Sequence, residues 1–420
     1  MRRKLMDRLS EWKEKSKNSL VKPILMTGTR GVGKTYLSYE FGKSFYQDII
    51  YINFERNAKL KRLFREDKLD QILINISQYF QKTLDKDVIL ILDEIGDCQE
   101  GIQFILQEKV HKLPFDVIGI SSKPFESIKF HEKLIDCVEH ITLYPFDFEE
   151  YLWATGYEWY SDVIREHFAK NTKVPDIVHR ELLSIFEEYL NVGGFPRVIN
   201  EYVNTETAIN ISEQQNSIIE SFYADARNQT DESLYIKVKS ILSSMDMQIG
   251  KKNKKFQYKL IRKGATKNLY IDGIYYMQHA NMVMKVDKLD SDQFKLYLSD
   301  VGLQMSMILA EKNQVSRDDR QVRKGIIENS IVQNLMPHYP KIYFWESNAQ
   351  AKIDLILKDN LDMIPIEVSI DNNTRTKSLS IFKSIYHVKK SIKISTKNFG
   401  YRNNIKYIPL YAVFCLDEKF

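Results

Sequence analysis

Cysteine is scarce in this sequence. Three cysteines, Cys98, Cys137 and Cys415, are spread over 420 residues and have no spacing typical of metal ligands. So few cysteines exclude a disulfide framework and suit a reducing compartment. No stretch approaches the ~20 consecutive apolar residues that a transmembrane helix needs. We therefore expect a soluble, cytoplasmic protein without a membrane partner.

Acidic residues are missing from two stretches of the chain. Residues 251–271 hold eight Lys and Arg and no Asp or Glu, and residues 372–416 hold nine and none. The whole chain has a net charge of only +5, so the rest of it is acidic. Concentrated positive charge fits contact with a polyanion, and we expect DNA to face 251–267 and 372–416. An ordinary solvated lysine-rich surface explains each run as well.

Glycine is also infrequent, yet three glycines fall within one stretch of eight residues. The stretch reads Gly28-Thr-Arg-Gly-Val-Gly-Lys-Thr35 and fits G-x-x-x-x-G-K-[ST], the phosphate-binding loop of P-loop NTPases. Residues 23–27 before it have a strand pattern, and residues 36–43 after it have a helix pattern. Lys34 is expected to reach the β- and γ-phosphates, and the Thr35 hydroxyl to bind Mg²⁺. The predicted nucleotide-binding residues of this loop are Gly28, Thr29, Arg30, Gly31, Val32, Gly33, Lys34 and Thr35.

A second motif lies about sixty residues further on. Asp87-Val-Ile-Leu-Ile-Leu-Asp93-Glu94 is a continuous apolar strand that ends in two carboxylates, as in a buried parallel sheet. We expect Asp93 to hold the Mg²⁺ shell and Glu94 to polarise the attacking water as the catalytic base. The alternative is a glycine turn and an unrelated core strand. No Asn-Lys-x-Asp motif that would read guanine is present, so the predicted cofactors are ATP and Mg²⁺.

The order of patterns predicts several domains of α/β type. Residues 1–22 read as a basic amphipathic helix. A doubly wound parallel sheet is expected from the alternating strands and helices that follow. Its candidate strands are 23–27, 50–54, 88–92, 116–120 and 139–143. Residues 146–230 lack strand patterns and read as a helical lid, which completes a first domain at 1–230.

Residues 231–310 read as a winged-helix domain. A helix at 233–247 and another ending near His279 precede a hairpin from the two short strands around 283–287 and 295–298. Residues 311–420 form the third predicted domain. It is expected to contain helices at 324–335 and 376–386, and strands at 341–345, 352–358, 363–370 and 407–414.

These motifs, in this order, resemble a large prokaryotic family: AAA-like P-loop ATPases fused to a C-terminal restriction-endonuclease-like domain, PD-(D/E)xK in type, of unassigned function. The landmarks are residues 28–35, Ile52-Asn-Phe-Glu55, Leu92-Asp-Glu-Ile95, 143–152, Gly193-Gly-Phe-Pro196, Lys255-Phe-Gln-Tyr258, 294–302, Glu328-Asn329, Ile353-Asp354 and Ile364-Pro-Ile-Glu-Val368. The resemblance implies an extra strand between the two nucleotide-binding strands. It also implies a polar side chain at the end of the fourth strand that senses the γ-phosphate, here Ser121 or Ser122. An ordinary strand-terminal serine is the alternative.

The chain departs from this resemblance at two positions of the ATPase domain. Relatives usually carry Gln where this chain has Gly96. They also carry a basic residue near the position of Cys137. A cysteine does not replace a basic residue in stabilising transition-state charge. Arg197 is a candidate for phosphate contact, or else an exposed arginine at a helix start.

The resemblance implies a nuclease-like metal site in the last domain. Glu328, Asp354 and Glu367 occupy its three carboxylate positions, and Ser369 stands at the position of the expected lysine. Lys352, two residues before Asp354, either supplies a relocated amine or fills the metal position, and Lys377 is another donor. Without a lysine beside the carboxylates, we expect a degenerate site rather than an active nuclease.

The leading hypothesis is therefore an ATP-driven switch that acts on DNA. An ATP-regulated nuclease and a non-hydrolysing ATP sensor that scaffolds a protein partner are the alternatives. The oligomeric state is left open by the sequence.

Overall fold

A computed structural model describes residues 1–18, 21–66, 68–107, 113–125, 128, 131–205, 208–310, 319–347, 351–359, 362–370 and 376–417. Its contacts divide the chain into two compact units. The N-terminal unit contains Arg2–Tyr144 with His279–Asn281, and the C-terminal unit contains Pro145–Gln278 and Met282–Phe420. The predicted lid thus belongs by its contacts to the C-terminal unit. The predicted domain boundary at 310/311 borders on residues outside the described ranges. Residues 372–375, where the second basic run starts, lie outside them too. The three-domain division stays a prediction.

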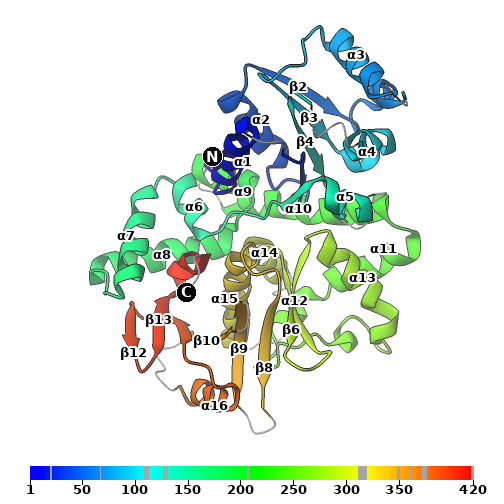
Figure 1. The fold of residues 1–420 in the computed structure, drawn as a ribbon. Helices are drawn as coiled ribbons and strands as arrows, with labels where there is room; N and C mark the ends of the chain where they lie inside the picture. The colour runs from blue at the N-terminus through cyan, green and yellow to red at the C-terminus, as the bar shows by residue number, and fades with distance from the viewer. Residues whose placement is uncertain are drawn as a thin grey trace. The chain divides into compact units, whose positions relative to one another are not determined.

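The N-terminal unit is built on a five-stranded parallel sheet (Figure 1). The strands are β1 (Ile24–Thr27), β2 (Asp48–Asn53), β3 (Val88–Asp93), β4 (Asp116–Ser121) and β5 (Glu139–Thr142), in the spatial order β2-β3-β4-β1-β5. Strand β4 therefore lies between β1, which leads into the glycine-rich loop, and β3, which ends in the acidic pair. The extra strand implied by the resemblance is confirmed, as is the parallel α/β fold.

Helices cover both faces of this sheet. They are α1 (Leu5–Asn18), α2 (Lys34–Phe45), α3 (Leu69–Phe80), α4 (Gln99–Leu106) and α5 (His131–Cys137), with short 3-10 helices η1 (Ala58–Phe64) and η2 (Ile95–Asp97). Side chains alternate along the buried strand β3, so that Leu90 and Leu92 join the core with α3 and α4. Ile89 faces Gly42 of α2 on the opposite side. The predicted N-terminal helix packs through Trp12 against Phe41, with ring centroids 6.2 Å apart.

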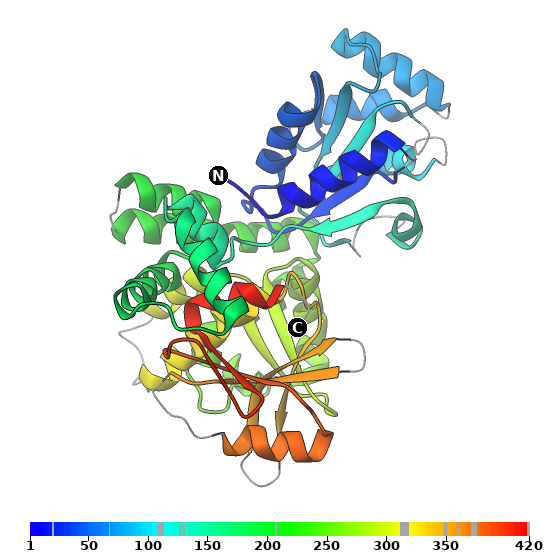
Figure 2. The ribbon, with the colours of Figure 1, turned by 60° about the vertical axis from the view of Figure 1, so that its left-hand side comes forward.

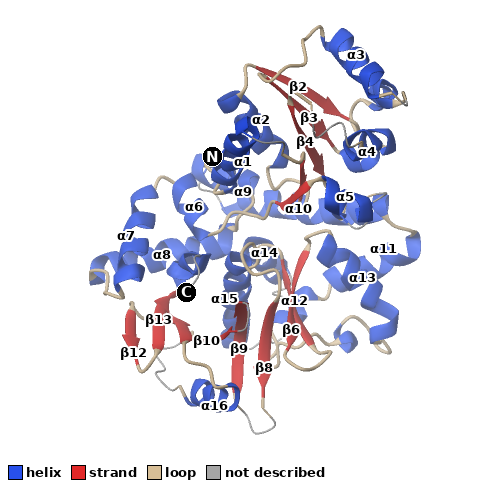
Figure 3. Cartoon of the chain, viewed as in Figure 1, coloured by secondary structure: helices blue, strands red, loops and turns tan. Residues whose placement is uncertain are grey.

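The C-terminal unit combines many helices with an eight-stranded mixed sheet (Figures 2 and 3). The helices are α6 (Phe148–Ala154), α7 (Glu158–Lys170), α8 (Asp176–Val192), α9 (Pro196–Thr205), α10 (Ala208–Gln229), α11 (Glu232–Leu242), α12 (Met245–Ile249), α13 (Lys267–His279), α14 (Val301–Ala310), α15 (Asp319–Leu335) and α16 (Lys377–Tyr386). The strands are β6 (Val283–Lys288), β7 (Phe294–Leu298), β8 (Ile342–Glu346), β9 (Lys352–Asp359), β10 (Asp362–Val368), β11 (Ser391–Ser395), β12 (Gly400–Arg402) and β13 (Ile405–Pro409).

The hairpin predicted as the wing is part of this sheet. Strand β6 pairs with β7 and also, in parallel, with β8, where Val286 is in register with Ile342. The sheet order is β12-β13-β11-β10-β9-β8-β6-β7. The segments predicted as winged-helix and restriction-endonuclease-like therefore share one sheet, and both fold assignments stay predictions.

The C-terminal end of the chain differs from the predicted strand at 407–414. Strand β13 ends at Pro409, and the following 3-10 helix η6 (Leu410–Asp417) is buried from Leu410 to Leu416. A run that is apolar on every side fits a buried helix as well as a buried strand. The strand prediction was therefore wrong for the residues after Pro409. The predicted helix 233–247 is likewise broken, into α11 and α12.

Several landmarks of the resemblance meet in the C-terminal unit. The Gly194 N–H donates to Asp300 Oδ2 at 2.6 Å, and the Phe146 N–H donates to the Gly194 carbonyl at 2.7 Å. A Cβ on Gly194 would lie 2.2 Å from the Phe146 carbonyl oxygen, so only glycine fits this crossing. Burial raises the pKa of Asp300 to about 6, against the N–H donors that lower it. These motifs thus have a packing role.

Candidate functional site

The glycine-rich loop connects β1 to α2 through backbone conformations that favour glycine. Gly28, Gly31 and Gly33 have φ values of 146°, 82° and 102°. A Cβ on Gly28 would lie 2.4 Å from the carbonyl oxygen of Leu143, which a side chain does not tolerate. The buried Arg3 donates to the Tyr144 carbonyl at 2.6 Å and thereby fastens the chain entering α1 beside this loop.

Lys34 is buried at the first position of α2. Its ammonium donates to the carbonyl oxygens of Gly28 at 2.8 Å and Thr29 at 3.0 Å, and to Ser122 Oγ at 3.1 Å. The ammonium therefore lies inside the loop. The Thr29 hydroxyl is buried and, within the described structure, makes no hydrogen bond. The loop thus offers an ammonium and an unused hydroxyl group, a fit for phosphate oxygens.

Neutral donors bind both carboxylate oxygens of Asp93. Its Oδ2 accepts from the Thr35 hydroxyl at 2.9 Å, the Tyr51 hydroxyl at 2.6 Å and the Asn53 amide at 3.2 Å. Its Oδ1 accepts from the Glu94 N–H at 3.0 Å. Burial and the Asp93 hydrogen bond together raise the pKa of Tyr51, which keeps that donor neutral. The pairing of a threonine hydroxyl with a buried carboxylate suits a Mg²⁺ shell.

Glu94 is bound at both carboxylate oxygens by Ser122. The Ser122 N–H donates to Oε2 at 2.9 Å, and its hydroxyl donates to Oε1 at 2.6 Å. The same hydroxyl accepts from Lys34, so a continuous chain runs from Lys34 through Ser122 to Glu94. Glu94 has a φ of 51°, an uncommon conformation for a residue with a side chain.

Ser121, the other predicted sensor, lies elsewhere. Its hydroxyl accepts from the Lys123 N–H at 3.0 Å, whereas the hydrogen bonds to Lys34 and Glu94 are made by Ser122. Ser122, one residue beyond β4, is thus the serine that contacts the predicted catalytic residues. The two serines could not be separated by pattern because the strand end was uncertain by one residue.

The two departures in the ATPase domain have different surroundings. A Cβ on Gly96 would lie 2.7 Å from Ser121 Oγ and 3.3 Å from the Lys123 side chain. Lys123 in turn forms an ion pair with Asp97 at 2.5 Å. Glycine at this position therefore makes room for Lys123. Cys137 ends α5 and is half-buried.

Two predicted arginines also have defined places. Arg30 of the loop makes two hydrogen bonds of 3.1 Å with the carboxylate of Glu55, just beyond β2. Arg197 is exposed in the first turn of α9 in the C-terminal unit, as the helix-start alternative predicted.

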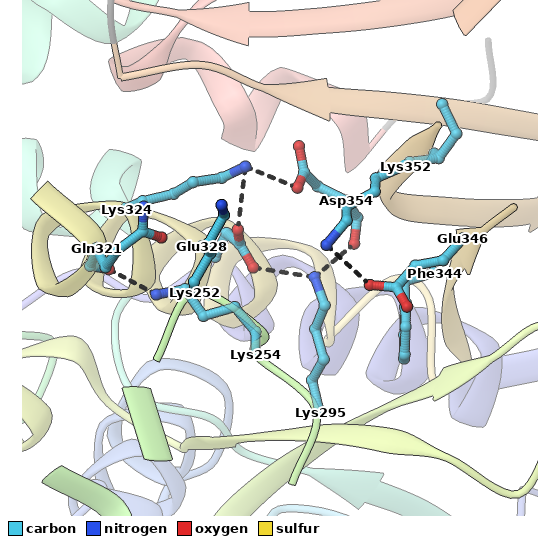
Figure 4. Close-up of a pocket in the computed structure, with 11 residues that line it drawn as sticks. Lys252, Lys254, Lys295, Gln321, Lys324, Glu328, Phe344, Glu346, Lys352 and Asp354 are labelled. Carbon is cyan, nitrogen blue, oxygen red and sulfur yellow. Dashed lines mark hydrogen bonds and ion pairs between the residues drawn. The ribbon is translucent and has the colours of Figure 1, made fainter. Parts of the chain in front are cut away.

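The three predicted nuclease-like carboxylates are each paired with a lysine of the C-terminal unit. Glu328 Oε2 accepts from Lys295 at 3.0 Å, and from the Tyr297 hydroxyl at 2.6 Å. Figure 4 shows Lys295 and Lys324 approaching Glu328 from different sides.

The other two carboxylates are bound in the same way. Asp354 accepts from Lys324 at 2.8 Å, and its second oxygen accepts from the Val368 N–H at 2.8 Å. Glu367 accepts from Lys393, whose side chain is buried, at 3.1 Å.

Lysines thus occupy the surroundings in which a metal ion was expected. Within the described ranges, no group of three or more His, Cys, Asp or Glu side chains is arranged to hold a metal ion. Burial alone would raise the pKa of Glu328, but Lys295 and Lys324 outweigh it and lower that pKa to about 2. The two lysines therefore stabilise the anionic form of Glu328.

Lys352 does not have the predicted part in this arrangement. Its ammonium pairs with Glu346 at 3.4 Å, because Lys352 and Glu346 are in register on the adjacent strands β9 and β8. Lys324 of α15 is the lysine that reaches Asp354. Ser369 follows β10 and donates its N–H to the Ile394 carbonyl, and Lys377 is exposed at the start of α16.

A pocket of about 230 Å³ opens beside these residues, and we call it the lysine pocket. Strands β7, β8 and β9, helix α15 and the segment after α12 line it (Figure 4). Its lining residues are Lys252, Lys254, Lys295, Gln321, Lys324, Glu328, Phe344, Glu346, Lys352, Ile353 and Asp354. Lys252 and Lys254 of the basic run therefore meet two of the three predicted carboxylates, Glu328 and Asp354, at one site.

The aromatic residues of the basic runs differ in exposure. Phe256 is half-buried and stacks on Phe294, with ring centroids 5.3 Å apart. Phe399 is buried, and the half-buried Tyr386 stacks on Phe382. Tyr401 is exposed. Burial leaves Phe399 unsuited to stacking on bases.

Three family models match separate parts of the chain. Residues 21–152 match an AAA domain, residues 183–314 a domain of unknown function (DUF8612), and residues 323–413 another (DUF4143). Together with the loop and the strand order, the first match supports an AAA-like P-loop ATPase domain in this part of the chain. The other two models carry no assigned function. No curated protein matches the chain.

Solved structures similar to this chain are distant from it. The Walker-type ATPase PABY2304 of Pyrococcus abyssi is 15% identical, covers 73% of this chain and 95% of its own, and gives a TM-score of 0.43. The Thermotoga maritima RuvB Holliday junction branch migration motor is 13% identical over 69% and 90%, with a TM-score of 0.32. The Aeropyrum pernix Orc1 protein in complex with DNA is 12% identical over 79% and 93%, with a TM-score of 0.28. No function is transferred at these values.

None of the described helices is both long enough and apolar enough to cross a membrane.

Proposed function

We propose that this protein binds Mg-ATP and hydrolyses it, and that the nucleotide state acts as a switch on DNA. The observation that carries the proposal is the hydrogen-bonded chain from Lys34 through Ser122 to Glu94. One hydroxyl group joins the predicted phosphate-binding lysine to the predicted catalytic base. A change in the hydrogen bonding of Lys34 therefore alters the hydrogen bonding of Glu94, and the reverse also holds.

The residues that would hold the nucleotide are those of the loop from Gly28 to Thr35. Lys34 would exchange its carbonyl partners for phosphate oxygens, and Thr35 with Asp93 would hold Mg²⁺. Bound Mg²⁺ would supply positive charge to the phosphates and to the oxygen that leaves. The neutral donors around Asp93 support this assignment, because they leave its negative charge available to a cation.

Glu94 is the residue that would take a proton from the attacking water. Both of its oxygens are bound by Ser122, so the base is held away from any other partner. When Lys34 turns to phosphate, Ser122 loses one of its hydrogen bonds and its hydroxyl becomes freer to release Glu94. This exchange is how we propose that nucleotide binding prepares the base for hydrolysis.

The coupling to DNA is proposed from exposed positive charge. In the first run Lys251, Lys252, Lys259, Arg262, Lys263 and Lys267 are exposed, and in the second Lys377, Lys389, Lys390 and Arg402 are. Such side chains contact phosphates without reading sequence, so we expect the affinity to fall steeply with salt. Lys393, buried against Glu367, is unsuited to this role.

Metal-dependent DNA cleavage has less support. Each carboxylate of the nuclease-like set already has a lysine partner, and a Mg²⁺ ion would have to displace these lysines. We therefore propose a degenerate site, retained for folding and for contacts with anions.

The test is steady-state ATP hydrolysis by the full chain at low salt, with and without duplex DNA, beside Glu94→Gln. We expect turnover that DNA stimulates and that the variant loses. Tight ATP binding without turnover, with or without DNA, would contradict the proposal and favour a non-hydrolysing sensor for a protein partner.

A further inference from the structure

The lysine pocket contains more positive than negative charge. Five lysines and three carboxylates line it, which leaves a formal excess of two positive charges. The lysines are Lys252, Lys254, Lys295, Lys324 and Lys352, and the carboxylates are Glu328, Glu346 and Asp354. The internal pairs neutralise part of this charge, but the carboxylates are too few to neutralise all of it.

Lys254 is the least compensated of the lysines whose contacts are known. Its ammonium donates to the Ile249 carbonyl at 2.6 Å and to the Gln321 carbonyl at 2.5 Å, both neutral oxygens. An ammonium group has three donors, so one remains beyond these two bonds.

The pocket itself is small. Its volume of about 230 Å³ lies below the ~300–1,000 Å³ of pockets that enclose a drug-sized ligand. It therefore suits a compact anion, or the charged end of a larger molecule. A phosphate monoester carries about −1.5 to −2 charges at pH 7, which matches the excess of two.

We propose that the lysine pocket binds a phosphate monoester without a metal ion, with Lys254 and Lys252 as its main ligands. Lys295, paired with Glu328, and Lys324, paired with Asp354, add positive charge to the pocket wall. The monoester is either a free small phosphate compound or the 5′-phosphate end of a nucleic acid. This site is separate from the ATP site and does not depend on ATP turnover.

The experiment uses full-length Lys34→Ala, so that binding of phosphate at the nucleotide loop does not contribute. Inorganic phosphate is titrated by calorimetry into this chain and into two further double variants in the same background. Lys252→Met with Lys254→Met removes the pocket ligands. Lys259→Met with Lys263→Met removes the same charge from exposed positions of the same run outside the pocket.

We expect the pocket variant to lose phosphate affinity by about tenfold or more, and the control variant to stay within about twofold. Equal losses in the two double variants, or no phosphate binding by the Lys34→Ala chain, would overturn the proposal. Circular dichroism establishes that each variant is folded.

Two oligonucleotides of one sequence identify the source of the monoester. Preference for the 5′-phosphorylated form, lost in the pocket variant, supports a nucleic acid end as the ligand. Equal binding of the two forms beside pocket-dependent phosphate binding supports a small phosphate compound.

Discussion

Two sites of this molecule place lysines and carboxylates together, and they do so in opposite ways. At the nucleotide loop, Asp93 and Glu94 are bound by hydroxyl, amide and backbone donors, while Lys34 rests on carbonyl oxygens. In the C-terminal unit, Glu328 and Asp354 are bound directly by Lys295 and Lys324. At the first site neutral donors bind the carboxylates, and at the second site lysines bind them directly.

The difference decides which ions each site is able to take. Carboxylates with neutral partners keep their negative charge for a cation. The nucleotide loop therefore suits Mg²⁺ and phosphate together. The carboxylates of the C-terminal unit already have lysine partners, which a further cation would have to displace.

The largest expected effect is on the rate of ATP hydrolysis, which should depend on the nucleotide loop and not on the carboxylates of the C-terminal unit. Glu94→Gln should keep ATP binding and lower the hydrolysis rate about 10²–10⁴-fold, because the proton acceptor is lost. The matched change Asp354→Asn in the C-terminal unit should leave hydrolysis within about twofold. Both rates come from a coupled phosphate-release assay. Equal losses in both variants would show that the C-terminal carboxylates take part in ATP turnover.

Lys34→Ala should weaken nucleotide binding about 10²-fold, since a charge-assisted contact to phosphate is removed. Lys43→Ala is the control, because Lys43 lies on the same helix but is exposed and paired with Glu40. Titration with a fluorescent ATP analogue measures both affinities. An unchanged affinity in Lys34→Ala would refute the assignment of the loop.

Ser122→Ala should change the rate of ATP hydrolysis less than Glu94→Gln does, and should raise it. The variant removes the hydroxyl that binds Glu94, so hydrolysis without DNA should rise toward the DNA-stimulated rate, by about tenfold or less. Ser121→Ala, one residue away, should show no such rise. If Ser122→Ala instead lowers turnover equally with and without DNA, the serine positions the base during the reaction and is not a restraint.

The smallest effect is a pH dependence in the lysine pocket. Burial, together with Lys324 and Lys295, lowers the pKa of Lys254 from 10.5 to about 8, while Glu328 and Asp354 act in the opposite direction. Between pH 8 and 10.5 the unfolded chain binds a proton that the folded chain does not, so stability rises with pH across this window.

Lys254→Met should remove the rise in stability with pH. The unfolding free energy of the parent minus that of the variant should therefore increase from pH 8 to 10. Urea unfolding at several pH values measures it. A difference that stays constant would mean that Lys254 titrates as an ordinary exposed lysine.

The nucleotide loop was predictable because its chemistry lies in two short segments. Eight consecutive residues define the phosphate loop, and one strand carries both carboxylates. The register of Ser121 and Ser122 was not predictable, because it depends on where β4 ends. The tyrosine and asparagine that bind Asp93 come from β2, and no spacing in the sequence links them to β3.

The lysine partners of the C-terminal carboxylates were missed for a similar reason. Lys295 lies in a strand that the pattern assigned to a separate wing, and only the sheet brings it to Glu328. One signal was available: Phe294-Lys-Leu-Tyr-Leu298 places a lysine inside an apolar strand. A buried lysine needs a partner of opposite charge or strong acceptors. Lys393 within Ser391–Ser395 gives the same signal.

The most direct test compares neutral replacements of one carboxylate at each site. In Glu328→Gln the buried Lys295 loses its anion, so amides of α15 should lose about 3–5 kcal/mol of protection in native-state hydrogen exchange. In Asp93→Asn the amide oxygen still accepts from Thr35, Tyr51 and Asn53, and only the bond from the Glu94 N–H is lost, so amides of β3 should change by less than about 2 kcal/mol. Equal losses, or a larger loss in Asp93→Asn, would contradict the claim that only the C-terminal carboxylates have lysine as their resident cation.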